Sequence, residues 1–252
     1  PDSRLDQIAK IASSQKIIPT QLEFVDIAGL VRGASKGEGM GNEFLGNIRS
    51  VDAIVHVLRC FDGEVTHVDG SVDPVRDAET VETELLISDL ESVEKQIYSN
   101  GKRAKGGDKD AKDKLEVLNI VVAVLQDGQA ARTADISADQ KPIFDQLQLL
   151  TAKPVLYVAN VEEENAATGN DYSKKVDEMA AATGGVSVII SAAIEAEVAS
   201  LSDDDEKAEF LEDLGLKETG LKRIISAGYD LLGLLTFFTV GPKEARAWTV
   251  VE

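Results

Sequence analysis

The sequence has 252 residues, of which 43% are hydrophobic, so the chain can bury a substantial core in one large domain or two. Its formal net charge of −19 argues against a protein that binds nucleic acid or anionic membranes over most of its surface, so any such contact must be local. No apolar run has the length of a membrane span, and the single cysteine, Cys60, excludes an internal disulfide, as expected of a reducing cytoplasm.

The first elements lead to a carboxylate followed by a glycine-rich segment. Residues 5–11 carry apolar side chains at helical spacing, and residues 17–19 (IIP) end that pattern. Residues 22–26 (LEFVD) then predict a buried strand that ends at Asp26, with Gly29 three residues later. This order of elements is typical of a nucleoside triphosphatase.

Asp26 and Gly29 are the candidate Mg²⁺ and γ-phosphate residues. An Asp at the end of a buried parallel strand can help hold Mg²⁺, while the Gly amide senses the γ-phosphate. A bare D-x-x-G is common, and a strand end with an ordinary turn is the alternative. The glycine-rich run 33–41 favours a switch loop. Ordering so many glycines costs much conformational entropy, and few loops carry that cost unless they have a function. Leu30 stands where many GTPases carry the glutamine that orients the attacking water, so either another group positions this water or hydrolysis is slow until a partner helps.

A second strand and a polar loop follow. Residues 41–50 predict a short helix, and residues 51–61 (VDAIVHVLRCF) predict a strand of a parallel sheet covered on both faces. Residues 62–73 form a polar loop that carries His67. His56, inside the strand, is interpreted as a packed core residue, and neither histidine has the neighbours of a zinc site or a hydrolytic triad.

Residues 81–98 and 115–125 predict two helices, because their apolar side chains recur at helical spacing. Joined by a segment with two glycines, they form a helical hairpin inserted between strands of the sheet. Residues 95–114 contain seven basic and three acidic residues, a local charge of +4. The expected RNA or ribosome contacts at this tip are Lys102, Arg103, Lys105, Lys109 and Lys112. A solvated helix turn is the alternative.

Strands and helices alternate after the hairpin. Residues 137–140 (SADQ) contain a capping-box signature for a helix that ends near residue 150. Residues 154–159 (PVLYVA) and 186–190 (VSVII) predict two further strands, separated by a helix over 172–182. The alternation predicts an α/β fold with a doubly wound, mostly parallel sheet, whose ligands bind beyond the carboxyl ends of the strands.

Residues 160–163 (NVEE) stand where guanine-specific enzymes carry N-K-x-D. In that motif the Asp accepts two hydrogen bonds from the guanine edge and the Lys packs along the base. Here Glu and Val replace them, so guanine selectivity is expected to be lost and adenine becomes acceptable. The candidate base-binding residues are Asn160, Val161 and Glu163, with Ser191 and Ala192 beneath the base through backbone amides. An acidic loop without a ligand is the alternative.

The end of the chain is rich in β-forming residues. Helices are predicted near 203–214 and 220–232, and residues 235–251 contain two β-rich runs around a Gly-Pro turn. A two-stranded hairpin is not stable alone, so a small β-rich domain is expected to continue past Glu252. No G-x-x-x-x-G-K-[ST] loop occurs in the sequence, so the first strand, phosphate loop and first switch are expected before Pro1.

Four segments together resemble the YchF, or Obg-like ATPase, family of P-loop NTPases. They are residues 23–49 (EFVDIAGLVRGASKGEGMGNEFLGNIR), 102–112 (KRAKGGDKDAK), the N-x-x-E at 160–163 and residues 237–250 (FFTVGPKEARAWTV). The resemblance implies a nucleotide-binding domain in two parts, residues 1–80 and 137–234, a helical coiled-coil insertion over 81–136 and the start of a TGS domain at 235–252.

The resemblance also implies a function and places individual residues. It implies hydrolysis of ATP in preference to GTP, ribosome binding, and links to translation and oxidative stress. Independently of the resemblance, we expect Mg²⁺ as the cofactor and a cytoplasmic protein, with a monomer favoured. His67, within VTHVDG, matches the histidine that replaces the missing glutamine in this family. Residues 1–252 alone are expected to be inactive. A ribosome- or RNA-binding module with incidental hydrolysis and a conventional Obg-type GTPase remain the alternatives.

Overall fold

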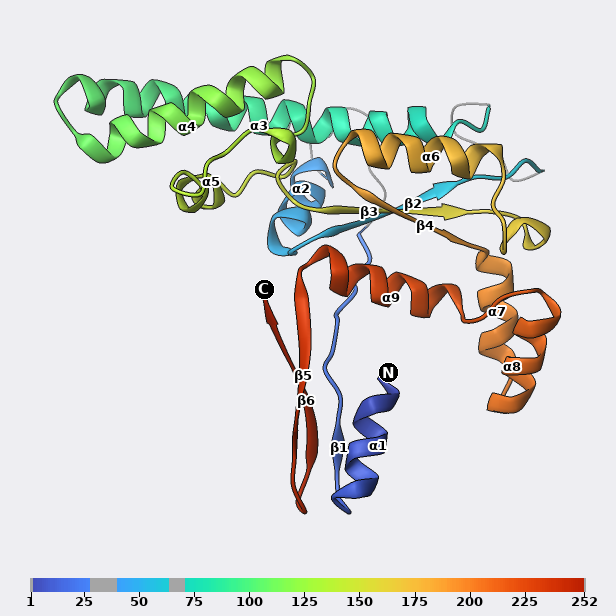
Figure 1. The fold of residues 1–252 in the computed structure, drawn as a ribbon. Coiled ribbons are helices and arrows are strands. Elements are labelled where there is room, and N and C mark those ends of the chain that lie inside the picture. The colour runs from blue at the N-terminus through green and yellow to red at the C-terminus, as the bar shows by residue number, and fades with distance from the viewer. Residues whose placement is uncertain (1, 28–39, 64–70, 252) are drawn as a thin grey trace. The chain divides into compact units, whose positions relative to one another are not determined.

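The computed structural model describes residues 2–27, 40–63 and 71–251, and its elements are labelled in Figure 1. The predicted site residues Gly29 and His67 lie outside the described residues. The chain divides into two compact units, one formed by residues 1–26 with 225–252 and the other by residues 27–224. The predicted bounds of the nucleotide-binding, helical and TGS domains remain predictions.

The larger unit contains a three-stranded parallel sheet in the order β2-β3-β4. These strands are Ile54–Arg59, Val155–Asn160 and Val186–Ile190. The central strand β3 is buried over five of its six residues. The register pairs Asn160 with Arg59 on one side and with Ile190 on the other, so the three carboxyl ends lie next to one another. The predicted parallel sheet is confirmed.

The larger unit also contains several helices besides the hairpin described below. They are α2 (Met40–Ser50), α6 (Asp171–Ala182), α7 (Ala192–Ser200) and α8 (Asp204–Asp213), and α9 (Gly220–Leu231) begins in this unit. Helix α6 begins at a capping box formed by Asn170 and Ser173. Its buried Val176 packs in a core that also holds Tyr157 of β3. The sheet is therefore covered by α6, a helix that the sequence pattern predicts almost residue for residue.

Helices α3 (Pro74–Lys105) and α4 (Lys109–Gln126) form the predicted hairpin (Figure 1). Asp73 and Asp108 cap the two amino termini through their side chains, which satisfies amides that would otherwise lack partners. Gly107, at φ +93°, makes the turn between the helices with a conformation that favours glycine. Buried Val93 and Val121 belong to the cluster between the two helices.

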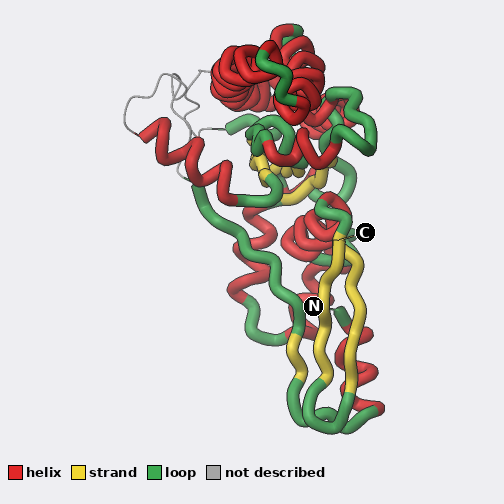
Figure 2. Tube along the Cα trace, turned by 90° about the vertical axis from the view of Figure 1, so that its left-hand side faces the viewer, coloured by secondary structure: helices red, strands yellow, loops and turns green. Residues whose placement is uncertain are grey.

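The smaller unit contains a second three-stranded sheet, in the order β1-β6-β5. Figure 2 shows its strands Ile17–Ile18, Ala245–Val251 and Leu234–Val240 lying side by side. Strands β5 and β6 are antiparallel, which confirms the predicted hairpin, whereas β1 runs parallel to β6, a pairing that the sequence did not indicate. Helix α1 (Ser3–Ile11) packs its buried Leu5 against Ala245 and Ala247.

Three local predictions are wrong. Residues 22–26 form no strand, and Val25 is 53% exposed, because no described strand pairs with them and an unpaired strand has no hydrogen-bonded partner. Strand β2 is covered on one face only, since Val57 on the other face is 60% exposed. The helix predicted over 137–150 is only α5 (Lys141–Gln146): Pro142 favours a helix start beside it, and Gln148 at φ +48° ends it.

Candidate nucleotide-base site

The side chain of Asn160 joins the two loops that the sequence predicts to bind a base. Its Oδ1 accepts a hydrogen bond of 2.9 Å from the backbone N of Ala192, the first residue of α7. Backbone bonds continue the sheet beyond the strand ends, from Val161 N to Ile190 O at 2.9 Å and from Cys60 N to Asn160 O at 2.8 Å. The loops after β3 and β4 are therefore held together by hydrogen bonds.

Glu163 and Val161 have opposite surroundings. Glu163 is exposed and begins a 3-10 helix over Glu163–Asn165, and its carboxylate has no hydrogen bond or ion pair within the described part of the chain. Val161 is 2% exposed and packs with Cys60 and Val176 in the core. The acidic side chain is thus available to a ligand, while the valine side chain holds the loop against the sheet.

Ser191 places a buried hydroxyl beneath the start of α7. Its side chain is 2% exposed, and its Oγ has no hydrogen-bond partner among the described residues, which is uncommon for a buried polar atom. Ala192 and Ala193 beside it are exposed. The amide of Ala192 already donates to Asn160, so in this structure it is engaged by the protein itself.

Asn170 also holds this region, through a long-range contact that the sequence pattern does not indicate. Its Nδ2 donates to the carbonyl of Cys60 at 2.7 Å, while its Oδ1 accepts from Ser173 N at 3.0 Å. Asn170 therefore connects the end of β2 to the start of α6. An Asn before a helix indicates a cap, but the bond to Cys60 can be seen only in the tertiary structure.

Burial, and then the charge of Glu162, raises the pKa of the Cys60 thiol to about 12, so the thiol stays protonated.

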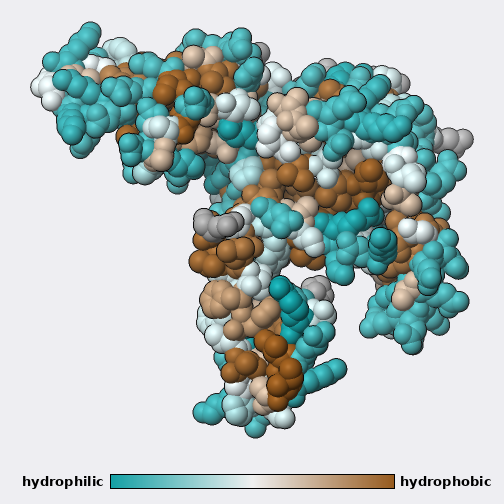
Figure 3. All heavy atoms as spheres, in the orientation of Figure 1, coloured by the Kyte–Doolittle hydropathy of each residue, from teal (hydrophilic) through white to brown (hydrophobic). Residues whose placement is uncertain are grey.

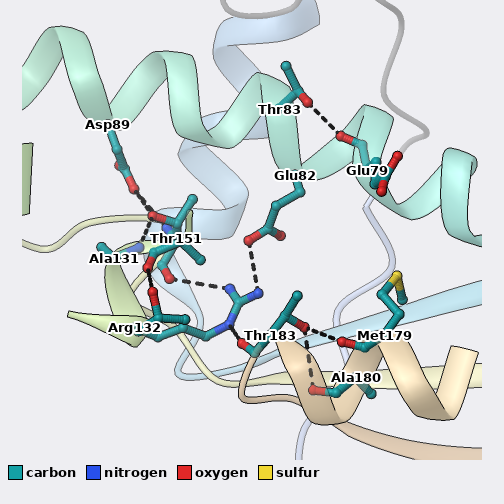
Figure 4. A network of polar contacts seen from close by, with 12 residues as sticks. Glu79, Glu82, Thr83, Asp89, Ala131, Arg132, Thr151, Met179, Ala180 and Thr183 are labelled. Atoms are coloured by element: carbon teal, nitrogen blue, oxygen red, sulfur yellow. Dashed lines mark hydrogen bonds and ion pairs between the residues drawn. The ribbon is translucent and has the colours of Figure 1, made fainter. Parts of the chain in front are cut away.

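A buried polar network anchors the hairpin to the segment that precedes β3 (Figure 4). Asp89 of α3 accepts bonds from Leu150 N at 2.9 Å, Thr151 N at 2.8 Å and Thr151 Oγ1 at 2.7 Å. Burial raises the pKa of Asp89, although these hydrogen bonds act in the opposite direction. The carboxylate of α3 thereby fixes the turn that leads into the strand carrying Asn160.

Arg132 provides a second anchor in the same network. Its side chain is 7% exposed, and its Nη2 lies 2.9 Å from Glu82 Oε1 of α3, as an ion pair rather than an aligned hydrogen bond. Its Nε donates to the carbonyl of Thr183, just after α6, at 2.9 Å. Arg132 thus connects the hairpin to the helix that covers the sheet (Figure 4).

The basic tip of the hairpin is strongly hydrophilic (Figure 3). The predicted contact residues do not behave alike: Arg103 pairs with Asp108 at 2.8 Å, and the Lys102 ammonium lies 4.2 Å from the centre of the Tyr98 ring. Three further lysines are exposed and form no ion pair within the described residues. They are Lys105, Lys109 and Lys112.

Comparison with known proteins identifies the family. A protein named ribosome-binding ATPase YchF from Pasteurella multocida is 51% identical over 251 residues, which are 99% of this chain and 69% of that protein. The chain belongs to the YchF ribosome-binding ATPase family. The Bacillus subtilis YchF of the same description is 47% identical over 252 residues, again 99% of this chain and 69% of the relative.

Two further comparisons support membership of the YchF family. The structure of the Schizosaccharomyces pombe YchF GTPase matches with a TM-score of 0.86 at 36% identity, covering 100% of this chain and 68% of that one. A family model described as 50S ribosome-binding GTPase matches residues 6–89. The resemblance to YchF proteins that the sequence indicates is confirmed, as is an α/β fold with a long helical hairpin.

Asp26 is the residue that the sequence predicts to hold Mg²⁺. Asp26 is exposed and belongs to the smaller unit, whereas Asn160 and Ser191 belong to the larger one. The described residues include no group of three or more His, Cys, Asp or Glu side chains suited to a metal ion. Among them, no helix has both the length and the apolar character needed to cross a bilayer.

Proposed function

We propose that this protein is a nucleotide-dependent switch that hydrolyses ATP, and GTP less well, and binds the ribosome in the cytoplasm, where it regulates translation or stress responses, with a monomer favoured. Relatives named ribosome-binding ATPases at about half identity support the activity and the partner. The fungal relative is named a GTPase, so the choice of base needs its own argument from residues.

The hydrogen bond between Asn160 Oδ1 and Ala192 N carries the assignment of the base site. It holds the loops after two neighbouring parallel strands together at the carboxyl edge of the sheet, where ligands of α/β folds bind. Glu163 follows three residues after Asn160, with an exposed carboxylate. Its side chain is one methylene longer than the Asp of guanine-specific sites, and we infer that this selects adenine over guanine.

The remaining predicted residues have proposed roles of their own in handling the phosphates. Asp26 would contribute one carboxylate to Mg²⁺, and it fits this role because its side chain is exposed and a hard cation prefers oxygen ligands. When bound, Mg²⁺ neutralises charge on the transferred phosphate. Gly29 would contact the γ-phosphate, and His67 would orient the attacking water. We further propose that the sheet is of the P-loop NTPase type and that residues 235–252 begin a TGS domain.

Shortening Glu163 tests the base assignment in the intact protein. Glu163→Asp should shift the ratio of GTP to ATP affinity toward GTP by about fivefold or more, the worth of one hydrogen bond to the guanine edge. Displacement of a fluorescent ADP analogue by each nucleotide measures the ratio. Val161 is left unchanged, because a lysine at this buried position would place a charge in the core.

The neighbouring exposed Glu164 provides a matched control. Glu164→Asp removes the same methylene one residue away and should leave the GTP to ATP ratio unchanged. If Glu163→Asp leaves the ratio unchanged as well, Glu163 does not face the base. If both variants shift it equally, the cause is a general change in the loop rather than a contact between Glu163 and the base.

A further inference from the structure

One face of helix α3 near the hairpin tip combines three lysines with an exposed aromatic ring. Lys95, Tyr98, Lys102 and Lys105 follow the spacing i, i+3, i+7 and i+10, which places them on one side of a helix. These four residues are called the α3 stripe. Tyr98 is 70% exposed, more than the exposed rings of Phe237 and Trp248.

The α3 stripe is separate from the packing of the hairpin. Val93 and Ile97 take part in the cluster between α3 and α4, and the helical period places them on another side of α3 from Tyr98. Removing the Tyr98 side chain would therefore leave the hairpin interior intact. The ring has no packing role that explains its presence, which distinguishes it from the buried aromatics of the core.

The charges around Tyr98 are available to an anion. The Lys102 ammonium lies 4.2 Å from the ring centre, and Lys105 is exposed with no ion pair among the residues described. Lys95 meets Glu91 at 3.7 Å, with both side chains more than half exposed, so this pair exchanges readily with solvent and ligands. The acidic residues on this side, Glu91 and Glu94, lie away from the tip, which leaves the tip end positive.

We propose that the α3 stripe binds an unpaired segment of RNA, with one base stacked on Tyr98 and the phosphates paired with Lys102 and Lys105. This inference rests on the proposed ribosome-binding function and names the kind of RNA that the arm contacts. Stacking of a base on an aromatic ring is stronger than an exposed cation–π contact, so a base can displace the Lys102 ammonium from the ring. The displaced ammonium then lies beside the incoming nucleotide, where it can neutralise a phosphate.

Binding of RNA to the intact protein tests the proposal. The probes are a fluorescein-labelled unstructured oligouridine and a duplex RNA of equal length, measured by fluorescence anisotropy. Tyr98→Ala should weaken binding of the single strand by about 5- to 150-fold, and binding of the duplex much less. Tyr98→Phe, which keeps the ring, should bind the single strand as the unchanged protein does.

Two charge variants separate the α3 stripe from general charge. Lys105→Ala should lower the slope of log affinity against log salt by about 0.7, the value for one single-strand phosphate. Lys174→Ala removes an exposed lysine, paired with Asp171 at 3.2 Å, from α6 and should leave the slope unchanged. Equal losses for Tyr98→Ala on both probes, or none on either, would overturn the stacking proposal.

Ribosome co-sedimentation distinguishes this inference from the proposed function. Reversing the charges of Lys102, Arg103 and Lys105 should remove the protein from the ribosome pellet while ATP hydrolysis continues. If that reversal acts as expected but Tyr98→Ala binds single strands normally, the stacking inference fails and the ribosome-binding function stands. If the reversal leaves the pellet unchanged, the arm is not the ribosome contact, and the α3 stripe loses its role with it.

Discussion

His56 shows how a single side chain on the covered face of β2 responds to its environment. It is half-buried, with its ring centroid 6.0 Å from that of Tyr157 on β3. Burial lowers the pKa of His56 to about 4, although the charge of Asp77 acts in the opposite direction. The imidazole is therefore neutral in the folded protein near neutral pH, in agreement with a packing role rather than an acid–base one.

This lowered pKa of His56 predicts a loss of stability in mild acid. Because the unfolded chain binds a proton near its ordinary pKa and the folded chain does not, the contribution is complete above about 6.5 and is lost as the pH falls toward 4. Between about pH 7 and about pH 5 the loss is about 2 kcal/mol. His56→Gln should remove this difference, which urea unfolding at the two pH values measures; an unchanged difference would contradict it.

At the scale of elements, Asp89 holds the hairpin to the turn before β3. An Asn at this position keeps one acceptor oxygen but turns an amino group toward the donors of Leu150 and Thr151. Asp89→Asn should therefore lower the free energy of unfolding by about 1–3 kcal/mol, the cost of a buried unsatisfied group. Urea unfolding, followed by circular dichroism, measures this cost.

Glu91 offers the matched control for Asp89 on the same helix. It is exposed, and Glu91→Gln makes the same carboxylate-to-amide change where only the exposed pair with Lys95 is lost. The expected change is below about 1 kcal/mol. Equal effects of the two substitutions would show that the net charge of α3, rather than the buried contact, determines stability.

At the scale of the whole molecule, the amino-terminal helix is part of the carboxyl-terminal sheet unit. Leu5 is 3% exposed and packs against Ala245 and Ala247. Leu5→Ala should destabilise this unit by about 2–5 kcal/mol, since it removes apolar contacts and leaves a cavity. Trp248 on β6 is the only tryptophan in the chain, so its fluorescence reports on unfolding of this unit.

Ile11 lies on the same helix and is 85% exposed. Ile11→Ala should change the free energy of unfolding, as followed by Trp248 fluorescence, by no more than about 0.5 kcal/mol. It is therefore the control for Leu5→Ala. If Leu5→Ala and Ile11→Ala give the same denaturant midpoint for the unfolding transition seen by Trp248 fluorescence, the packing of α1 on β6 contributes little to the stability of the sheet.

Local features of the sequence determined most of the elements. Helical spacing of apolar residues predicts both helices of the hairpin, and the polar and apolar pattern predicts α6. These signals depend on neighbours a few residues away, so they can be read without a fold. The motif at residues 160–163, together with the other matching segments, was enough to indicate the family.

Only the tertiary structure decided which distant segments meet. The pairing of β1 with β6, the bond from Ala192 to Asn160 and the contact of Thr151 with Asp89 each join residues far apart in the chain. Residues 22–26 have the composition of a strand but form none, because a strand needs a hydrogen-bonded neighbour that its own amino-acid sequence does not specify. Long-range pairing and burial are properties of the folded chain as a whole, and local propensity does not encode the partner.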